Sequence, residues 1–151
     1  MKERIEPSKR SAYQVFRTIG TRWSDNDTYG HMNNVVHYSV FDTAVNGFLI
    51  ENGVLDISGG SEIFLVVETG CRYHAEMAFP DVITAGIRVA KLGNSSVRYE
   101  IGLFRNDDEI AAAEGFFIHV NVNRASRRPN HFGDAARRVL GPLVMSDALT
   151  S

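Results

Sequence analysis

Carboxylate, imidazole and amide side chains are concentrated between residues 22 and 38, RWSDNDTYGHMNNVVHY. A carboxylate can attack a carbonyl carbon or take a proton from water, and a histidine can carry a proton near neutral pH. Asp27 lies shortly before a long apolar segment, where the first N–H groups of a helix would be free to polarise a carbonyl. Gly30 permits a tight turn on the way to that helix. The stretch therefore combines the groups needed for attack on an acyl carbonyl.

A helix is predicted over about residues 33–52. Asn33 or Asn34 fits the N-cap position, unpaired N–H groups are expected at about residues 34–36, and Gly53 supplies a stop signal. When the segment is placed at 100° per residue, apolar side chains cover about half of the circumference. These side chains are Tyr38, Val40, Phe41, Ala44, Val45, Phe48 and Leu49. Such a wide apolar arc predicts a helix that is covered from several directions.

Strands are predicted where apolar and polar residues alternate, over residues 12–23, 62–78, 81–92, 95–106 and 109–123. The short connections AFPD, LGNS and RNDDE permit only antiparallel neighbours and so predict a meander. One long helix among such strands indicates an α+β fold, in which a curved antiparallel sheet of about five strands folds around a single buried helix. The segment NHFGDAARRVL is expected to form a short peripheral helix.

The composition fits one domain over residues 1–151, because 44% of the residues are hydrophobic and a second core has no room. A net charge of −2 offers no strong field to nucleic acid or to an anionic membrane, so neither is an expected partner. The start has no apolar h-region, and no later run reaches the ~20 apolar residues of a membrane span, so a soluble, cytoplasmic protein is expected. Cys71 is the only cysteine and is expected to be a buried thiol. The basic cluster at 124–128 is expected to be a solvated face.

The pattern D-x-D-x-x-G-H-x-N-N resembles the hydroxybenzoyl-CoA thioesterase branch of the hot-dog superfamily. Its fixed positions fall on Asp25, Asp27, Gly30, His31, Asn33 and Asn34. The similarity covers roughly residues 13–123: VVETGCRYHAEMAFPD is similar to the family's second strand and hairpin, and RVAKLGNSSVRYEIGLF to its central hairpin. The resemblance implies a curled antiparallel sheet wrapped around one long central helix, with the core at about 12–123 and a C-terminal peripheral segment at 124–151.

The resemblance also implies a hydrolase that cleaves an acyl-CoA thioester to a carboxylic acid and free coenzyme A, without a metal or a prosthetic group. Asp27 would be the nucleophile or the general base, and backbone N–H groups near Asn34 would polarise the carbonyl. Gly30 and His31 would shape the loop. A homodimer or homotetramer is implied, with the active site at the interface between protomers.

The resemblance implies further substrate-binding residues. Asn94, Ser95 and Ser96, in the central hairpin, would lie beside the pantetheine arm or the thioester. His37 stands where the family usually has an aromatic residue, commonly tyrosine, and it falls inside the apolar arc of the helix. It would make the acyl pocket more polar, add a second titratable group or form a hydrogen bond within the core.

Other interpretations compete for these residues. Asp25 fits a structural role in the loop better than a catalytic one, and Asp27 alone could also be a turn residue. A divalent metal is disfavoured, because the spacing of Asp25, Asp27, His31 and His37 matches no strong ligand signature. A hot-dog enoyl-CoA hydratase or dehydratase usually separates its aspartate and histidine by four residues, whereas three separate Asp27 from His31. A non-catalytic module that binds CoA thioesters would have less need of a carboxylate beside the carbonyl.

Overall fold

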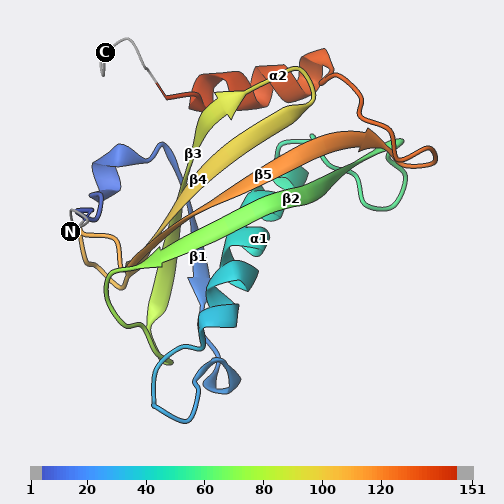
Figure 1. Ribbon diagram of the computed structural model, residues 1–151. Coiled ribbons are helices and arrows are strands. Elements are labelled where there is room, and N and C mark those ends of the chain that lie inside the picture. The colour runs from blue at the N-terminus through green and yellow to red at the C-terminus, as the bar shows by residue number, and fades with distance from the viewer. Residues whose placement is uncertain (1–4, 146–151) are drawn as a thin grey trace.

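The chain forms a five-stranded antiparallel sheet with a helix of 18 residues packed on one face (Figure 1). The computed structural model describes residues 5–145. The strands are β1 (Val15–Gly20), β2 (Glu62–Tyr73), β3 (Val82–Leu92), β4 (Ser96–Arg105) and β5 (Ala113–Asn123). They lie in the order β1-β3-β4-β5-β2, so that β1 and β2 form the two edges of the sheet.

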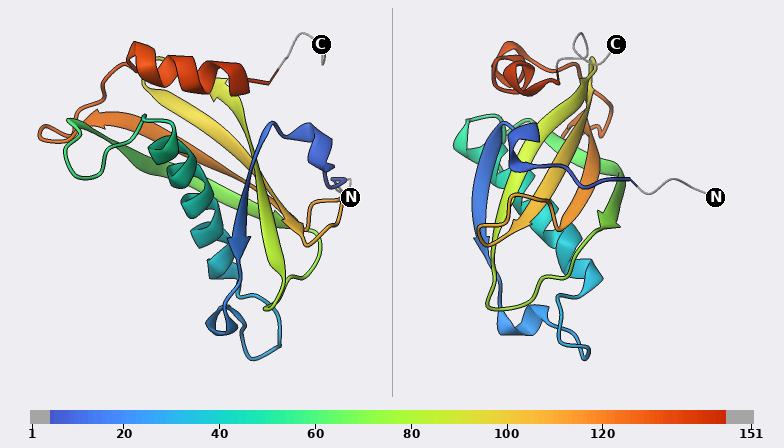
Figure 2. Two further views of the ribbon diagram at one scale, coloured as in Figure 1. Left: turned by 180° about the vertical axis from the view of Figure 1, so that it is seen from behind. Right: turned by 90° about the vertical axis from the view of Figure 1, so that its left-hand side faces the viewer.

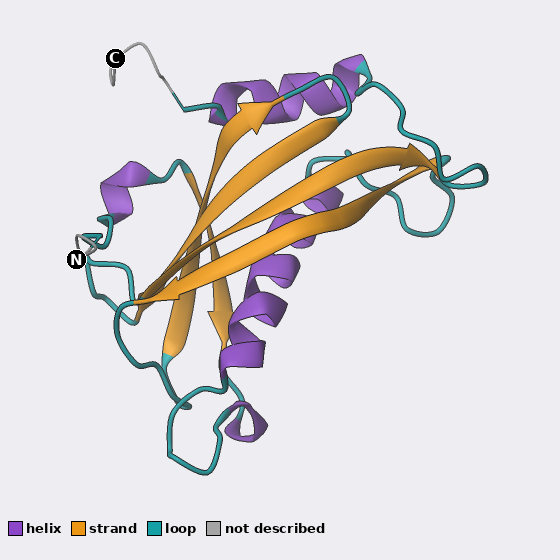
Figure 3. Cartoon of the chain, in the orientation of Figure 1, coloured by secondary structure: helices purple, strands orange, loops and turns teal. Residues whose placement is uncertain are grey.

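The remaining elements are short, apart from helix α1 (Figure 3). The helices are α1 (Asn34–Glu51) and α2 (Asp134–Leu140), and the 3-10 turns are η1 (Arg10–Ala12), η2 (Trp23–Asp25) and η3 (Gly141–Leu143). Helix α2 confirms the predicted peripheral helix, whereas residues 146–151 of the expected C-terminal segment lie outside the described residues. No helix within residues 5–145 is long and apolar enough to cross a membrane.

Helix α1 begins and ends at the residues that the sequence indicated. The Asn33 side chain caps the helix, since its oxygen accepts a hydrogen bond from the Val35 N–H at 2.9 Å. Gly53, two residues after the last helical residue, has a φ of +73°, a conformation that glycine adopts without strain. Both helix signals are therefore confirmed.

Helix α1 lies across one face of the sheet (Figure 2), and its apolar arc packs against that face. Its buried side chains include Val40, Phe41, Ala44, Val45, Phe48 and Leu49. Ser39, Asp42 and Thr43 on the opposite side are exposed. The curved sheet is confirmed, but it covers only one side of an 18-residue helix. The prediction of one long central helix wrapped by the sheet is thus wrong, because the polar half of the helix stays in water.

The predicted antiparallel pairing across AFPD is also wrong, because β2 pairs with β5 and not with β3. Strand β2 ends at Tyr73, earlier than predicted, which leaves residues 74–81 as the connection. Eight extended residues reach about 26 Å, and three strand spacings measure about 14 Å, so the connection can pass beneath two strands. Strands β3, β4 and β5 do form the predicted meander.

Aromatic rings pack closely against glycines on the sheet face that points away from α1. A Cβ atom at Gly102 would lie 2.6 Å from the Tyr13 ring, and one at Gly70 would lie 2.7 Å from the Phe116 ring. Only glycine permits this close approach of ring and strand. Tyr13 thereby fastens the segment before β1 to the outer face of the sheet.

Candidate active site

Asp25 holds the start of the polar loop in place. Its carboxylate is almost fully buried and accepts hydrogen bonds from the Arg22 backbone N–H at 2.8 Å and from the Arg22 guanidinium at 2.8 Å. Its backbone carbonyl accepts a hydrogen bond from the Asn33 N–H at 2.9 Å. Asp25 therefore ties both ends of the loop together, in agreement with a structural role.

Asp27 lies at the tip of this loop, in a tight turn. The Gly30 N–H donates to the Asp27 carbonyl at 3.1 Å, and the Tyr29 N–H donates to Asp27 Oδ1 at 2.8 Å. Gly30 has a φ of +84°, which explains the need for glycine at this turn. The other carboxylate oxygen, Oδ2, lies 3.6 Å from Nδ1 of His31. The turn thus orients one carboxylate oxygen toward the imidazole.

The first turn of α1 retains one free backbone donor. The Val35 N–H donates to the Asn33 side chain, and the Val36 N–H donates to the Asn33 carbonyl at 2.9 Å. Among the hydrogen bonds formed within residues 5–145, none is donated by the Asn34 N–H. Free donors were expected at residues 34–36, and the cap removes two of them. The Asn34 N–H remains, at the positive end of the helix dipole.

A cleft of about 260 Å³ opens beside this donor. Its lining residues are His31, Met32, Asn34, His37, Tyr73, His74, Ala75, Glu76 and Met77. One wall is the start of α1, and the other is the end of β2 with the connection that leads to β3. The Met32 N–H donates to the Met77 carbonyl at 2.6 Å, and the Phe79 N–H donates to Asn26 Oδ1 at 2.9 Å. These bonds hold the two walls together.

His37 is the polar side chain on the buried side of α1. Its Nδ1 lies 3.3 Å from the Asn33 carbonyl oxygen, and its ring meets the edge of the Tyr73 ring with the centroids 4.7 Å apart. Burial lowers the pKa of His37 below its usual value, so the imidazole is neutral near pH 7. The Tyr73 hydroxyl donates to the Asn34 carbonyl at 3.4 Å, which places this ring across the cleft from the free donor.

The structure brings only some of the predicted residues together within the chain. Asn34, His31 and His37 line the cleft, whereas Asp27 lies behind His31 and does not line it. The turn Asn94–Ser96 lies at the opposite end of the sheet, beside the end of β5. There the Asn94 carbonyl accepts from the Phe132 N–H at 2.8 Å, and the Ser95 carbonyl accepts from the Asn121 N–H at 2.7 Å.

Sequence reasoning missed the second wall of the cleft. Tyr73, His74 and Met77 were read as part of an alternating strand, because the pattern continues past the end of β2. Only the sheet order places this segment beside the start of α1. Cys71, on the same strand, is half-buried, and burial raises the pKa of its thiol to about 11. The thiol is therefore protonated near pH 7 and is no candidate nucleophile.

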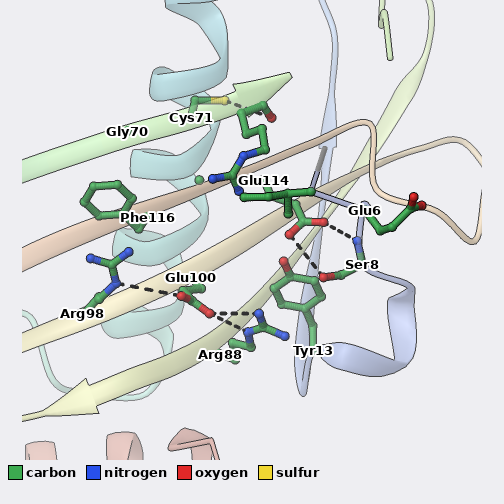
Figure 4. Close-up of a pocket in the computed structure, with 13 residues that line it drawn as sticks. Glu6, Ser8, Tyr13, Gly70, Cys71, Arg88, Arg98, Glu100, Glu114 and Phe116 are labelled. Atoms are coloured by element: carbon green, nitrogen blue, oxygen red, sulfur yellow. Dashed lines mark hydrogen bonds and ion pairs between the residues drawn. The ribbon is translucent and has the colours of Figure 1, made fainter. Parts of the chain in front are cut away.

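A larger cleft, of about 590 Å³, lies on the outer face of the sheet (Figure 4). Several of its charged groups are already engaged: Arg88 contacts Glu100 at 2.9 Å, and Glu114 accepts hydrogen bonds from Ser8. Arg98 stacks over the Phe116 ring at 4.0 Å. These contacts hold the N-terminal segment on the sheet and engage most of the charged side chains of this cleft. Arg72 also lines the cleft and forms no ion pair within residues 5–145.

The sheet has the strand order β1-β3-β4-β5-β2, α1 lies across one of its faces, and the polar loop precedes the N-terminus of α1. This arrangement is that of a hot-dog thioesterase. Residues 21–140 match the family model described as the thioesterase-like superfamily. The chain therefore belongs to this superfamily, and the resemblance stated above is confirmed. Membership supports thioester hydrolysis as the general class of chemistry.

Solved structures show the same fold. The PA5185 protein of Pseudomonas aeruginosa strain PAO1 is 51% identical, with 93% of this chain and 98% of that chain covered and a TM-score of 0.90. The PA2801 protein of Pseudomonas aeruginosa is 27% identical over 82% and 95% of the two chains, with a TM-score of 0.77. Slr0204 of Synechocystis, a 1,4-dihydroxy-2-naphthoyl-CoA thioesterase, is 12% identical over 85% and 96%, with a TM-score of 0.76, and shares the fold alone. A comparison with curated proteins gives no match.

Proposed function

We propose that this protein hydrolyses an acyl-CoA thioester to a carboxylic acid and free coenzyme A. The observation that carries the proposal is the free N–H of Asn34, which lies at the positive end of α1 and borders the cleft. A donor in this position stabilises the negative charge that develops on the carbonyl oxygen during attack. No metal ion is needed for this step, because the backbone supplies the polarising group.

Asp27 supplies the carboxylate in this mechanism. As a general base, it takes a proton from the water that attacks the carbonyl carbon; the C–S bond then breaks, and the departing thiolate of coenzyme A takes up a proton. As a nucleophile, it attacks the carbonyl carbon, and the C–S bond breaks to release the thiolate of coenzyme A, which takes up a proton; water then cleaves the acyl anhydride that remains. The side chain of His31 is one third exposed and lies between Asp27 and the cleft. Rotation of this ring opens Asp27 to the substrate.

A second copy of the chain completes the site in this proposal. Strand β2 is a long edge strand with exposed apolar residues, Val66 at 45% and Val67 at 59%, and such an edge favours pairing with another strand. An antiparallel β2 pair with its two-fold axis at Gly70 places Glu68 of each protomer opposite Arg72 of the other. Both side chains are exposed, and neither forms an ion pair within residues 5–145.

The same pairing gives a role to the turn Asn94–Ser96. Antiparallel pairing of the two edges brings the far end of one sheet alongside the cleft end of the other. We therefore place Asn94, Ser95 and Ser96 of one protomer near the pantetheine arm that leads into the cleft of its partner. Gly30 and His31 shape the loop on the other side of the same cleft.

A panel of acyl-CoA esters tests the proposed reaction. The purified protein is expected to release free thiol from at least one ester of the panel, which should include aromatic, short-chain, medium-chain and polar acyl groups. Binding of CoA esters without thiol release would contradict the proposal. An enoyl-CoA hydration assay on the same preparation would then test the hydratase alternative.

A further inference from the structure

His37 is an unusual residue for its place in the helix. The other buried side chains of α1 are all apolar, and His37 is only 3% exposed. A buried polar group without a hydrogen bond lowers stability. A histidine on an otherwise apolar helix face therefore needs a hydrogen-bond partner or has a functional role. The Asn33 carbonyl satisfies one ring nitrogen only.

The contacts of His37 fix its tautomer. A carbonyl oxygen can only accept, so the nitrogen that faces Asn33, Nδ1, carries the proton. Since burial keeps the ring neutral, Nε2 is unprotonated and can only accept a hydrogen bond. Nε2 has no hydrogen-bond partner among residues 5–145. It is nevertheless not fully shielded from solvent. It therefore opens on the cleft that His37 lines.

The free acceptor and the free donor lie on the same side of α1. Asn34 and His37 are three positions apart, which places their Cβ atoms about 5–6 Å from each other on one helix face. Tyr73 does not compete for Nε2, since its hydroxyl donates to the Asn34 carbonyl. Because Asn34 and His37 also line the same cleft, a thioester whose oxygen is bound at the Asn34 N–H has its acyl chain in a space that His37 borders.

We propose that His37 selects acyl groups that carry a hydroxyl on the carbon β to the thioester carbonyl. This inference rests on the proposed acyl-CoA hydrolysis and names the class of acyl group that the cleft takes. A site that is built to bond a substrate hydroxyl discriminates strongly against the analogue without it, because the buried acceptor then stays unpaired. The cleft of about 260 Å³ suits a short acyl group.

The test compares kcat/KM for β-hydroxybutyryl-CoA with that for butyryl-CoA. The wild-type protein is expected to favour the hydroxylated ester by about 10-fold or more. His37→Phe removes the acceptor and keeps an aromatic ring against Tyr73, so this preference is expected to fall to nearly one. His37→Gln keeps an acceptor oxygen and is expected to retain part of the preference. His131→Phe, at an exposed histidine outside the cleft, serves as the matched control and should keep the wild-type ratio.

A wild-type ratio close to one, or a preference that survives in His37→Phe, would overturn the inference. The two non-hydrolysable thioethers, S-(3-hydroxybutyl)-CoA and S-butyl-CoA, separate this failure from failure of the proposed reaction. Tighter calorimetric binding of the hydroxylated thioether that depends on His37, without hydrolysis of any ester, would support the inference while contradicting the proposed reaction. Equal binding of both thioethers without hydrolysis would overturn both.

Discussion

The side chain of His119 is buried on the helix-facing side of β5, and neither ring nitrogen has a hydrogen-bond partner within residues 5–145. Aromatic rings surround it, with the Tyr99 centroid at 5.4 Å and those of Phe64 and Phe117 at 5.9 Å. This burial lowers the pKa of His119 to about 4, against an ordinary value of about 6.5. The imidazole therefore remains neutral in the folded protein over a pH range in which the unfolded chain binds a proton.

The lowered pKa makes stability depend on pH. Because the unfolded state binds the extra proton between about pH 6.5 and pH 4, the free energy of unfolding falls as the pH is lowered through this range. At about pH 5 the loss from His119 is roughly 2 kcal/mol relative to about pH 7.5. His119→Phe fits the aromatic surroundings and is expected to remove this loss, with a smaller slope left from His37. Urea denaturation measures the free energy of unfolding at both pH values. If the difference between the two values is the same in His119→Phe as in the wild type, the prediction is contradicted.

Local signals in the sequence identified one side of the site. Short-range rules, which act within a few residues, predict Asn33 as the helix cap, Gly30 as the turn residue and Asp25 as the residue that holds the loop. Tyr73 and His74 were not found, because they meet α1 only through pairing of β2 with β5, across many residues of chain. The assignment of Asp27 stays a prediction.

At the scale of elements, β2 is the longer of the two edge strands of the sheet. It has 12 residues against 6 in the other edge strand, β1. A bulge between Val66 and Glu68 bends it. Long exposed edges invite association, so the charges on this strand are expected to select the register of the pair.

A charge swap on β2 tests this pairing. Glu68→Arg would place the new arginine of each protomer opposite Arg72 of the other. The dissociation constant of the dimer is therefore expected to rise about 10-fold. The double variant Glu68→Arg with Arg72→Glu restores opposite charges and is expected to recover the wild-type dissociation constant. Sedimentation over a dilution series measures both. A wild-type monomer, or equal dissociation of the single and double variants, would contradict the pairing.

The types of the elements and the β3-β4-β5 meander were predictable, whereas the neighbour of β2 was not. Burial determines the alternation of apolar and polar residues in β3, β4 and β5, and it determines the apolar arc of α1. These elements therefore lie close to where they were predicted. The position of β2 depends on a connection whose length was underestimated, because the apolar pattern runs on past Tyr73. The polar side of α1 was visible in the sequence, and it explains why the sheet covers the helix on one side only.

At the scale of the whole molecule, the hot-dog fold brings three separate features near the N-terminal end of α1, although Asp27 itself does not line the cleft. The helix end supplies a free N–H, the loop before it supplies a carboxylate, and the crossing connection closes the cleft. In the proposed β2 pairing, a second copy of the chain would add the turn Asn94–Ser96. Such a pairing would extend the site beyond the cleft of about 260 Å³ that the described residues form on this side.

The most direct measurement is kcat of Asp27→Asn on the best acyl-CoA ester. Asparagine keeps an oxygen that can accept from the Tyr29 N–H, so the turn is preserved while the base is lost. The kcat is expected to be lower by about 100-fold or more, with substrate still bound. Asp107→Asn, on an exposed turn away from the cleft, removes the same charge and should keep the wild-type kcat. A kcat for Asp27→Asn equal to that of the control would contradict the assignment of Asp27 to the reaction.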